Sequence, residues 1–373
     1  METCRWSARS PEIPTRPSPS RATPALPRAH LVRLLRRFRA SAATGSSSAA
    51  VPVEPITKNR MFILGVGYVG KFFGKELLDS GWSVSSWVKC KPELKVVSGT
   101  CKSAEKRKEL EDEGFDMYIL DANEPKMSVL SSMKEYTHLL VSIPPMAGIG
   151  DLLLQQEHLL RNMLKGGNIQ WLCYLSSTSV YGDSGGDWVD EDYPASPSNH
   201  MAKLRLDAEK GWLDLGGSLG ISALVFRLGG IYGPGRSAID TIIRKKPLTQ
   251  GQKMRSSRQY TARVHIEDIG QALKASISVP PSSRIYNIVD DDPAPREEVF
   301  EFAHMLVEKK WPGHFKDDPS PETTGSIAIG ASTRGEKRVS NARMKGELGV
   351  RLIHPSYKSG FHSIVEKTKI HSL

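Results

Sequence analysis

The stretch Met61-Phe-Ile-Leu-Gly-Val-Gly-Tyr-Val-Gly70 sets the fold class of this chain. Its four apolar residues predict a short buried strand, and the Gly-x-Gly-x-x-Gly pattern behind them opens a helix predicted over Lys71–Asp79. Gly65 allows the tight turn, Gly67 lets the backbone approach a pyrophosphate, and Gly70 permits close packing of helix on strand. The helix N-terminus supplies free N–H groups and a partial positive charge for phosphates. This context predicts a dinucleotide site made by Gly65, Gly67, Tyr68, Val69 and Gly70.

Strand-like and helix-like patterns alternate along the chain after this loop. Further strands are predicted at Ser83–Val88, Asp116–Leu120, His138–Ile143, Trp171–Leu175 and Ala223–Phe226. This alternation predicts an α/β fold with a doubly wound parallel Rossmann sheet and right-handed crossovers. The pattern then loosens into short strands near Ala262–His265 and Ile285–Val289, with helices near Glu267–Ser276 and Arg296–Glu308.

Three parts of the chain follow from these patterns. Residues 1–55 are predicted to be a transit peptide or disordered segment, and residues 56–235 an NAD(P)-binding Rossmann domain. Residues 236–373 are predicted to form a smaller C-terminal substrate-binding lobe, interleaved with the last strands of the sheet.

The composition of residues 1–50 indicates targeting. They carry nine Arg and two acids, a net charge of +7, with eight Ser, six Pro and nine Ala. An N-terminus that is rich in Arg and Ser and poor in acids is typical of an organellar transit peptide. The Ser, Ala and Pro content favours the chloroplast, whereas a basic amphipathic stretch at residues 30–39 would suit a mitochondrion. A disordered tail without an address is the alternative.

The remaining composition excludes several classes of protein. Of the net charge of +10, only +3 lies beyond residue 50, and Lys and Arg are not clustered with aromatic residues, which argues against nucleic-acid binding. No apolar run reaches the 18 residues or so that a membrane span requires. The four Cys and ten His show no ligand spacing, so no metal site is predicted.

The leucine-rich segment Asp151–Leu164 suggests a helix that could form a homodimer.

The end of the predicted second strand bears on the choice of dinucleotide. NAD-binding domains carry Asp or Glu there, which accepts a hydrogen bond from the ribose 2′-OH. Here the segment Ser83-Val-Ser-Ser-Trp-Val-Lys89 has no acid, and Lys89 could pair with a 2′-phosphate, so NADP(H) is favoured over NAD(H). Lys89 could also be a solvated loop residue. Lys89 and Pro144, which closes the fourth strand, complete the predicted cofactor residues.

Several motifs occur together, in order, after the glycine loop. They are Pro144-Pro145, Ser176-Ser-Thr-Ser-Val-Tyr-Gly182, Glu191-Asp-Tyr-Pro194, Arg227-Leu-Gly-Gly-Ile-Tyr-Gly-Pro-Gly-Arg236, Val264-His-Ile-Glu-Asp268, Tyr286-Asn-Ile-Val-Asp-Asp291 and Lys337-Arg-Val-Ser-Asn-Ala-Arg343. With them the chain resembles the extended and atypical short-chain dehydrogenase/reductases, the NAD-dependent epimerase/dehydratase family. Within that family it looks most like plant organellar Rossmann proteins of the bacterial YeeZ type. The resemblance runs from about Met61 to Val365.

The resemblance implies a catalytic serine and a Tyr-x-x-x-Lys pair. Ser177 matches the serine that holds the substrate oxygen, while the tyrosine, assisted by the lysine, transfers the proton. Aligned on Lys203, the tyrosine position holds Asn199. Aligned instead on Glu209, the pair becomes Met201 and Arg205, so neither register offers a phenol. The predicted substitutes are His200, Tyr181 and the loop acids Asp183, Asp190 and Glu191, each of which could also be a packing or solvated residue.

These features predict an NAD(P)-dependent oxidoreductase or epimerase that acts on a small hydroxyl or carbonyl substrate. Its predicted catalytic residues are Ser177, Lys203, Tyr181 and His200. The alternative is an NADP(H)-binding sensor or assembly factor without turnover, and RNA binding on the same fold is a weaker third hypothesis, because the fold alone decides none of these.

Overall fold

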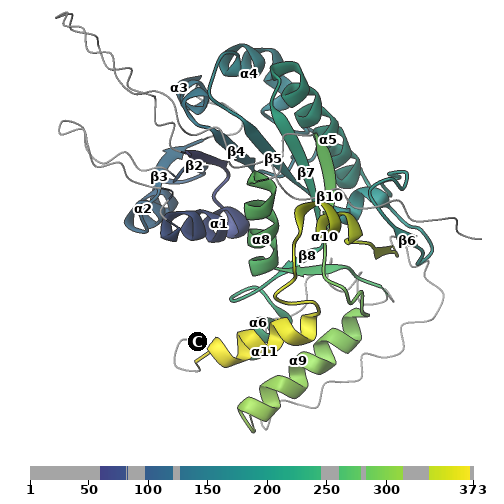
Figure 1. Ribbon diagram of the computed structural model, residues 1–373. Helices are drawn as coiled ribbons and strands as arrows, with labels where there is room; N and C mark the ends of the chain where they lie inside the picture. Colours follow the sequence, from purple (N-terminus) through teal and green to yellow (C-terminus); the bar gives the residue numbers. More distant parts are fainter. Residues whose placement is uncertain are drawn as a thin grey trace, which may run out of the picture. The chain divides into compact units, whose positions relative to one another are not determined.

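The computed structural model describes residues 59–80, 82, 97–120, 127–244, 260–278, 283–313 and 336–369. All of them lie in one compact unit, Ile56–Leu373. In these described residues the central sheet has seven parallel strands in the order β10-β7-β5-β4-β1-β2-β3 (Figure 1). Their bounds are β1 (Met61–Leu64), β2 (Val97–Cys101), β3 (Asp116–Ile119), β4 (His138–Val141), β5 (Trp171–Ser177), β7 (Ser222–Leu228) and β10 (Arg284–Ile288).

Helices cover both faces of this sheet, because the strands are apolar on both sides. Along β1, Met61 and Ile63 point into one core, whereas Phe62 and Leu64 point into the other. The first face is covered by α1 (Tyr68–Asp79), α2 (Ala104–Asp112), α8 (Ile266–Ile277) and α10 (Ala342–Leu348). The opposite face is covered by α3 (Met127–Ser132), α4 (Glu157–Leu164) and α5 (His200–Leu219). The predicted doubly wound Rossmann fold is confirmed.

A smaller lobe has an apolar core of its own. It contains α6 (Ala238–Ile243), α9 (Arg296–Lys310) and α11 (Tyr357–Lys367). The short parallel pair β8 (Gly230–Tyr232) and β9 (Arg263–His265) lies between this lobe and the sheet (Figure 1). A second pair joins β6 (Trp188–Val189) to β11 (Arg338–Val339), and short 3-10 helices are η1 (Met133–Glu135), η2 (Leu154–Gln156) and η3 (Thr178–Tyr181).

The described strand beside β1 has a weak signal in the sequence. The predicted segment Ser83–Val88 lies outside the described residues, and the strand beside β1 is Val97–Cys101. This strand reads Val-Ser-Gly-Thr-Cys, and its apolar signal is weak because its three central residues are serine, glycine and threonine. The glycine is required by packing, since a Cβ atom at Gly99 would stand 2.4 Å from Val66 Cγ2 and 2.7 Å from Ile63 O.

Other elements differ from prediction mainly at their ends. The first helix begins at Tyr68 rather than Lys71, and β5 extends to Ser177, the residue of functional interest. The segment Asp151–Leu164 is not one helix but η2 followed by α4, with Leu160 buried and Leu159 43% exposed. Among the described helices, none combines the length and apolar character needed to cross a membrane.

Candidate active site

The glycine loop between β1 and α1 has the geometry that a dinucleotide requires. Gly65 has a φ of +85°, and a Cβ atom there would stand 2.7 Å from Ile143 Cγ1. At Gly70 a Cβ atom would stand 2.9 Å from Ile63 Cγ2. Gly67, by contrast, has open space where a side chain would be, with no atom within 4 Å. Gly65 thus permits the turn, Gly70 lets α1 pack closely on β1, and Gly67 leaves room beside the backbone for a ligand.

The N-terminus of α1 is suited to bind phosphate. Gly67 is its N-cap residue, no side chain caps the helix, and its first turn carries no acid. The first N–H groups of the helix therefore point toward the open space at Gly67 with their partial positive charge. These residues fit a pyrophosphate, and with it a nicotinamide dinucleotide.

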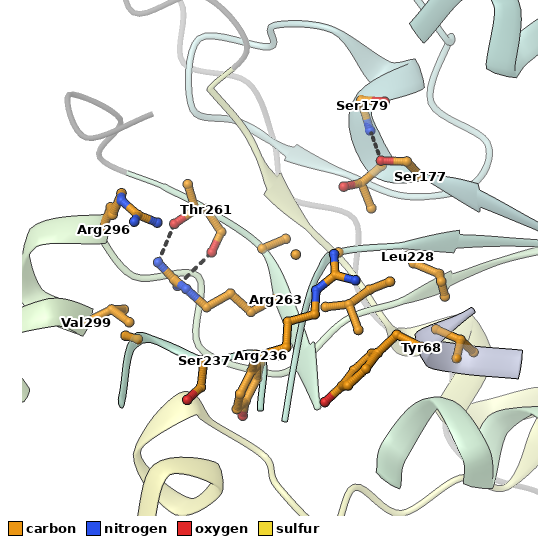
Figure 2. A pocket seen from close by; sticks show the side chains of 18 of the residues that line it. Tyr68, Ser177, Ser179, Leu228, Arg236, Ser237, Thr261, Arg263, Arg296 and Val299 are labelled. Carbon is orange, nitrogen blue, oxygen red and sulfur yellow. Dashed lines mark hydrogen bonds between the residues drawn. The ribbon is translucent and has the colours of Figure 1, made fainter. Parts of the chain in front are cut away.

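A cavity of about 900 Å³ lies at the carboxyl edge of the sheet (Figure 2). Its lining on the sheet side includes the predicted cofactor residues Gly67, Tyr68, Val69 and Pro144, together with Ser177 and Leu228. The lobe closes the opposite side, from Tyr232 to Phe361. Ligands of open α/β sheets bind at this edge, near the point where the strand order reverses, which here lies between β1 and β4.

The carboxyl end of β2 lies beside the glycine loop. Gly65 N donates to Thr100 Oγ1 at 2.9 Å, and Val66 N donates to Thr100 O at 2.8 Å. The residues that follow are the exposed Lys102 and Ser103, the N-cap of α2. Lys89, predicted for the 2′-phosphate, lies outside the described residues. Lys102 and Ser103 thus follow the carboxyl end of β2, the strand end from which Rossmann domains contact the ribose.

Ser177 ends β5 and lines the cavity, as Figure 2 shows. Its backbone is extended, and its Oγ accepts a hydrogen bond of 3.2 Å from Ser179 N at the start of η3. Because the Oγ accepts this bond, its O–H can be directed into the cavity. The position suits a hydroxyl that donates to a substrate oxygen.

Tyr181, predicted as a substitute proton donor, lies in the core rather than in the cavity. Its ring is fully buried, its O–H donates to Asn287 Oδ1 at 2.7 Å, and the Arg227 guanidinium lies 4.7 Å from the ring centre. Burial raises the pKa of Tyr181 to about 12, although Arg227 opposes the rise. The phenol therefore stabilises the turn after β5, and the sequence proximity to Ser177 was misleading.

Helix α5 decides between the two alignments of the catalytic pair. Asn199 is its N-cap, with Oδ1 accepting from Ala202 N at 2.9 Å, so it precedes the first turn. His200 and Lys203 are exposed and are not among the cavity residues, whereas Arg205 lines the cavity. The register that places Arg205 at the lysine position is therefore the one consistent with the structure. The predictions for His200 and Lys203 were wrong in placement, because the helix turns those side chains outward.

A buried network fixes the end of β5. Ser176 Oγ donates to Glu209 Oε1 at 2.5 Å, and Arg227 Nη2 donates to Glu209 Oε2 at 2.7 Å. The ion pair is almost fully buried, with side-chain exposures of 4% and 2%. It joins α5, β5 and β7 directly behind Ser177, which holds that residue in a defined orientation.

Cationic side chains dominate the charged lining of the cavity. Within the described residues these are Arg205, Arg236, Arg244, Arg263, Arg296 and Lys337, and the acid is Asp240. The Arg236 guanidinium lies 5.4 Å from the ring centre of Tyr68, whose pKa burial raises to about 12. Lys337 is buried, and its Nζ donates to Gly182 O at 2.8 Å, at the end of η3. Of these cationic residues, only Arg205 was predicted as a site residue, in the alternative alignment of the catalytic pair. The others were missed because they come from separate segments of the chain.

The fold and the glycine loop define a Rossmann protein of the dinucleotide-binding kind. The solved structures that resemble it include NAD-dependent epimerases and dehydratases, as the sequence motifs predicted. One is UDP-glucuronic acid 4-epimerase from Bacillus cereus in complex with NAD, 15% identical, covering 82% of this chain and 96% of that chain with a TM-score of 0.56. Another, a conserved protein of unknown function from Silicibacter pomeroyi, is 28% identical, covering 82% of this chain and 98% of that chain with a TM-score of 0.61.

A curated relative extends the comparison to sequence. Protein YeeZ from Escherichia coli K12 is 26% identical over 235 residues, which span 61% of this chain and 77% of YeeZ. No protein-family model matches the chain. The resemblance to the epimerase/dehydratase fold and to the YeeZ type is confirmed.

Proposed function

We propose that this protein is an NAD(P)-dependent oxidoreductase or epimerase that acts on a small anionic hydroxyl or carbonyl compound. One observation carries the proposal: the open space at Gly67, the N-terminus of α1 and Ser177 all line one cavity of about 900 Å³. The relatives with this fold include enzymes whose structures contain NAD. A nicotinamide dinucleotide at this position would supply hydride transfer.

The chain's own residues divide the remaining tasks. Ser177 donates its O–H to the reacting oxygen, and Arg205 stabilises the negative charge that develops on it. Lys337 transfers the proton, because its ammonium group lies in the cavity wall beside the turn that follows Ser177. In the direction of reduction the proton passes from Lys337 Nζ to the oxygen, and oxidation reverses this transfer.

We propose NADP(H) as the preferred dinucleotide. The described strand β2 ends without a following Asp or Glu, and Lys102 with Ser103 stands at the ribose position instead. An ammonium group and a hydroxyl can both bind a 2′-phosphate, and neither replaces the carboxylate that holds a free 2′-OH.

The proposed anionic character of the substrate rests on the lining of the cavity. The described residues that line the cavity include six cationic side chains and one carboxylate. Some of the cations are already engaged: Arg263 donates to Thr261 O and to Ala294 O, each at 2.8 Å. The excess of positive charge still favours carboxylates or phosphates over neutral carbonyl compounds.

The decisive experiment combines binding and turnover. The protein without residues 1–55 is titrated with NADPH and NADH, and NADPH oxidation is then followed over a panel of carbonyl compounds that pairs each anion with a neutral analogue. We expect turnover with anions and a fall of about 10²-fold in kcat for Ser177→Ala at unchanged NADPH affinity. Oxidation that Ser177→Ala leaves unchanged would remove the assigned role.

A second function is favoured by one specific observation. The tyrosine position of the supported register is Met201, so the usual phenol is missing while the dinucleotide loop is intact. A sensor or assembly factor that responds to NADPH would have these features. Tight NADPH binding without oxidation on any member of the panel would favour this function over catalysis.

Localisation and assembly are further proposals. We propose import into the chloroplast from the composition of residues 1–50, which carry nine Arg and two acids and lie outside the described residues. Diffuse cytosolic fluorescence of a fusion with this segment would reject it.

We also propose a homodimer through α4, where Leu159 is 43% exposed. A monomer mass by light scattering at micromolar concentration would reject that interface.

A further inference from the structure

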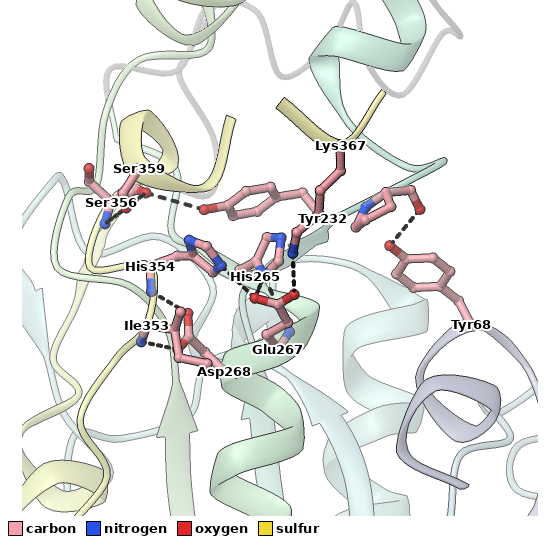
Figure 3. Close-up of polar contacts among 11 residues, drawn as sticks. Tyr68, Tyr232, His265, Glu267, Asp268, Ile353, His354, Ser356, Ser359 and Lys367 are labelled. Atoms are coloured by element: carbon pink, nitrogen blue, oxygen red, sulfur yellow. Dashed lines mark hydrogen bonds and ion pairs between the residues drawn. The ribbon is translucent and has the colours of Figure 1, made fainter. Parts of the chain in front are cut away.

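Three side chains meet at the N-terminal end of α8 (Figure 3). His265 ends β9 and caps α8, Glu267 lies in the first turn of α8, and His354 precedes α11. His354 Nε2 lies 2.7 Å from Glu267 Oε2, and His265 Nδ1 lies 3.8 Å from the same oxygen. One nitrogen of each imidazole and one carboxylate oxygen all lie within 4.8 Å of one another.

We propose that His265, Glu267 and His354 bind a divalent transition-metal ion of the zinc type. Two imidazoles and one carboxylate are a ligand set that Zn²⁺ uses in proteins. Bonds of about 2.0–2.1 Å in a tetrahedral site place neighbouring ligand atoms about 3.3 Å apart. The distances of 2.7 and 3.8 Å to the shared oxygen lie on either side of that value, so small side-chain rotations complete the site.

The two imidazoles are placed by the fold rather than by solvent. The His265 and His354 side chains are 1% and 6% exposed, and their ring centres lie 3.9 Å apart. Asp268 fixes the backbone on which His354 is carried, because its carboxylate accepts from Ile353 N at 2.6 Å and from His354 N at 3.2 Å. Supporting carboxylates of this kind orient a metal ligand without touching the ion.

His265 provides a second and independent indication. Its Nε2 atom is buried and makes no hydrogen bond within the described part of the chain. Its Nδ1 accepts only a long bond of 3.3 Å from Glu267 N. Buried polar atoms are normally well paired, so the long bond leaves the Nδ1 lone pair available to an ion, and the unpaired Nε2 does not compete by holding the ring in another orientation.

Lys367 sets the affinity of the site. Its Nζ lies 3.1 Å from Glu267 Oε1, the carboxylate oxygen that does not face the imidazoles. An ammonium group there balances the carboxylate and repels an incoming cation. The Glu267 side chain is 24% exposed, which gives an ion a path from solvent and a water molecule the fourth position.

The role of the ion is structural. It would join the β9–α8 junction to the segment before α11, and Phe361 of α11 lines the cavity. Binding would therefore stabilise the lobe against the sheet, independently of any dinucleotide. No metal site was predicted from the sequence, because His354 is distant in the chain from the other two ligands.

The test uses the purified full chain after dialysis against a chelator. Co²⁺ and Zn²⁺ are titrated separately, with the visible absorption of tetrahedral Co²⁺ and calorimetry as readouts. We expect one ion per chain, a micromolar or tighter Kd and a raised Tm. His354→Gln and Glu267→Gln should weaken binding at least about tenfold.

Two further variants separate a metal site from a simple ion-pair cluster. Lys367→Met should tighten binding, because it removes the competing charge, and the exposed His362→Gln on the same helix should leave binding unchanged. Binding that His354→Gln and Lys367→Met both leave unaltered would overturn the proposal, as would no bound ion at millimolar metal. The metal titration needs no substrate, so its failure leaves the proposed redox function standing.

Discussion

Replacing Gly67 with aspartate should weaken dinucleotide binding by two orders of magnitude or more while leaving the fold intact. The residue has φ −89° and ψ −153°, a conformation that aspartate adopts readily, and no atom lies within 4 Å of the position of a new Cβ. Asp is also a better N-cap than Gly by a few tenths of a kcal/mol, so α1 should be slightly more stable.

The expected loss of affinity follows from the charge that the variant introduces. A carboxylate about 5 Å from one phosphate charge costs about 3 kcal/mol at an effective dielectric constant of about 20. Each 1.4 kcal/mol or so is tenfold in Kd, so the charge alone should raise the Kd for NADPH about 100-fold, in addition to any effect of size. Gly67→Asn is the matched control, because it has the same size and a similar capping ability without the charge. We expect it to lose about tenfold by crowding alone.

Fluorescence titration of NADPH and thermal unfolding measure the two effects separately. The Asp variant should keep its Tm and lose binding, and raised salt should reduce the difference between Asp and Asn. If Gly67→Asp binds NADPH within threefold of the unchanged protein, the pyrophosphate does not lie at α1 and the cavity assignment is wrong.

Three other expectations follow from the structure. Lys102→Ala should lower the affinity for NADPH about tenfold and leave the affinity for NADH unchanged. An unaltered ratio of the two affinities would show that Lys102 does not contact the 2′-phosphate. Arg205→Met should lower the rate of carbonyl reduction at least about tenfold, whereas Lys203→Met, at an exposed position, should not. A loss of activity in Lys203→Met alone would favour the alignment of Lys203 with the catalytic lysine. Burial lowers the pKa of His138 from 6.5 to about 4. The unfolded chain then binds a proton that the folded chain does not, so stability is complete above about pH 6.5 and falls as the pH drops toward 4. In the His138→Gln variant, the free energy of unfolding measured with urea should fall less steeply between pH 6.5 and pH 4. The same dependence on pH as in the unchanged protein would contradict this expectation.

The parallel sheet could be predicted because its signals are local. The run Met61–Gly70 combines a strand, a turn and a helix start, and the apolar strands after it end in recognisable turns. Strand β2 could not be predicted, because Val97–Cys101 has little apolar character of its own. Its place in the sheet depends on Gly99 fitting against Val66 and Ile63, a contact that no local pattern reveals.

The site could be predicted only where one segment supplies it. Ser177 and Gly67 belong to continuous motifs, and both line the cavity. Lys337 belongs to a continuous motif, but its contact with Gly182 depends on chain folding across 155 positions. Tyr181 shows the opposite error, since a residue adjacent to the serine segment in sequence points into the core. Side-chain direction is set by tertiary packing, which spacing alone does not define.

The edge position of β10 also governs how this protein can be made. Strand β10 (Arg284–Ile288) hydrogen-bonds along β7, and α8 before it and α10 after it cover part of one face of the sheet. During vectorial synthesis on a ribosome, the first six strands emerge with the β7 edge unpaired and with the part of one apolar face that α8 and α10 cover still exposed. An open edge of this kind is prone to non-native pairing. The dinucleotide-binding half therefore reaches its final stability only after Leu348 has been translated, which makes protection of the nascent chain a requirement of this topology.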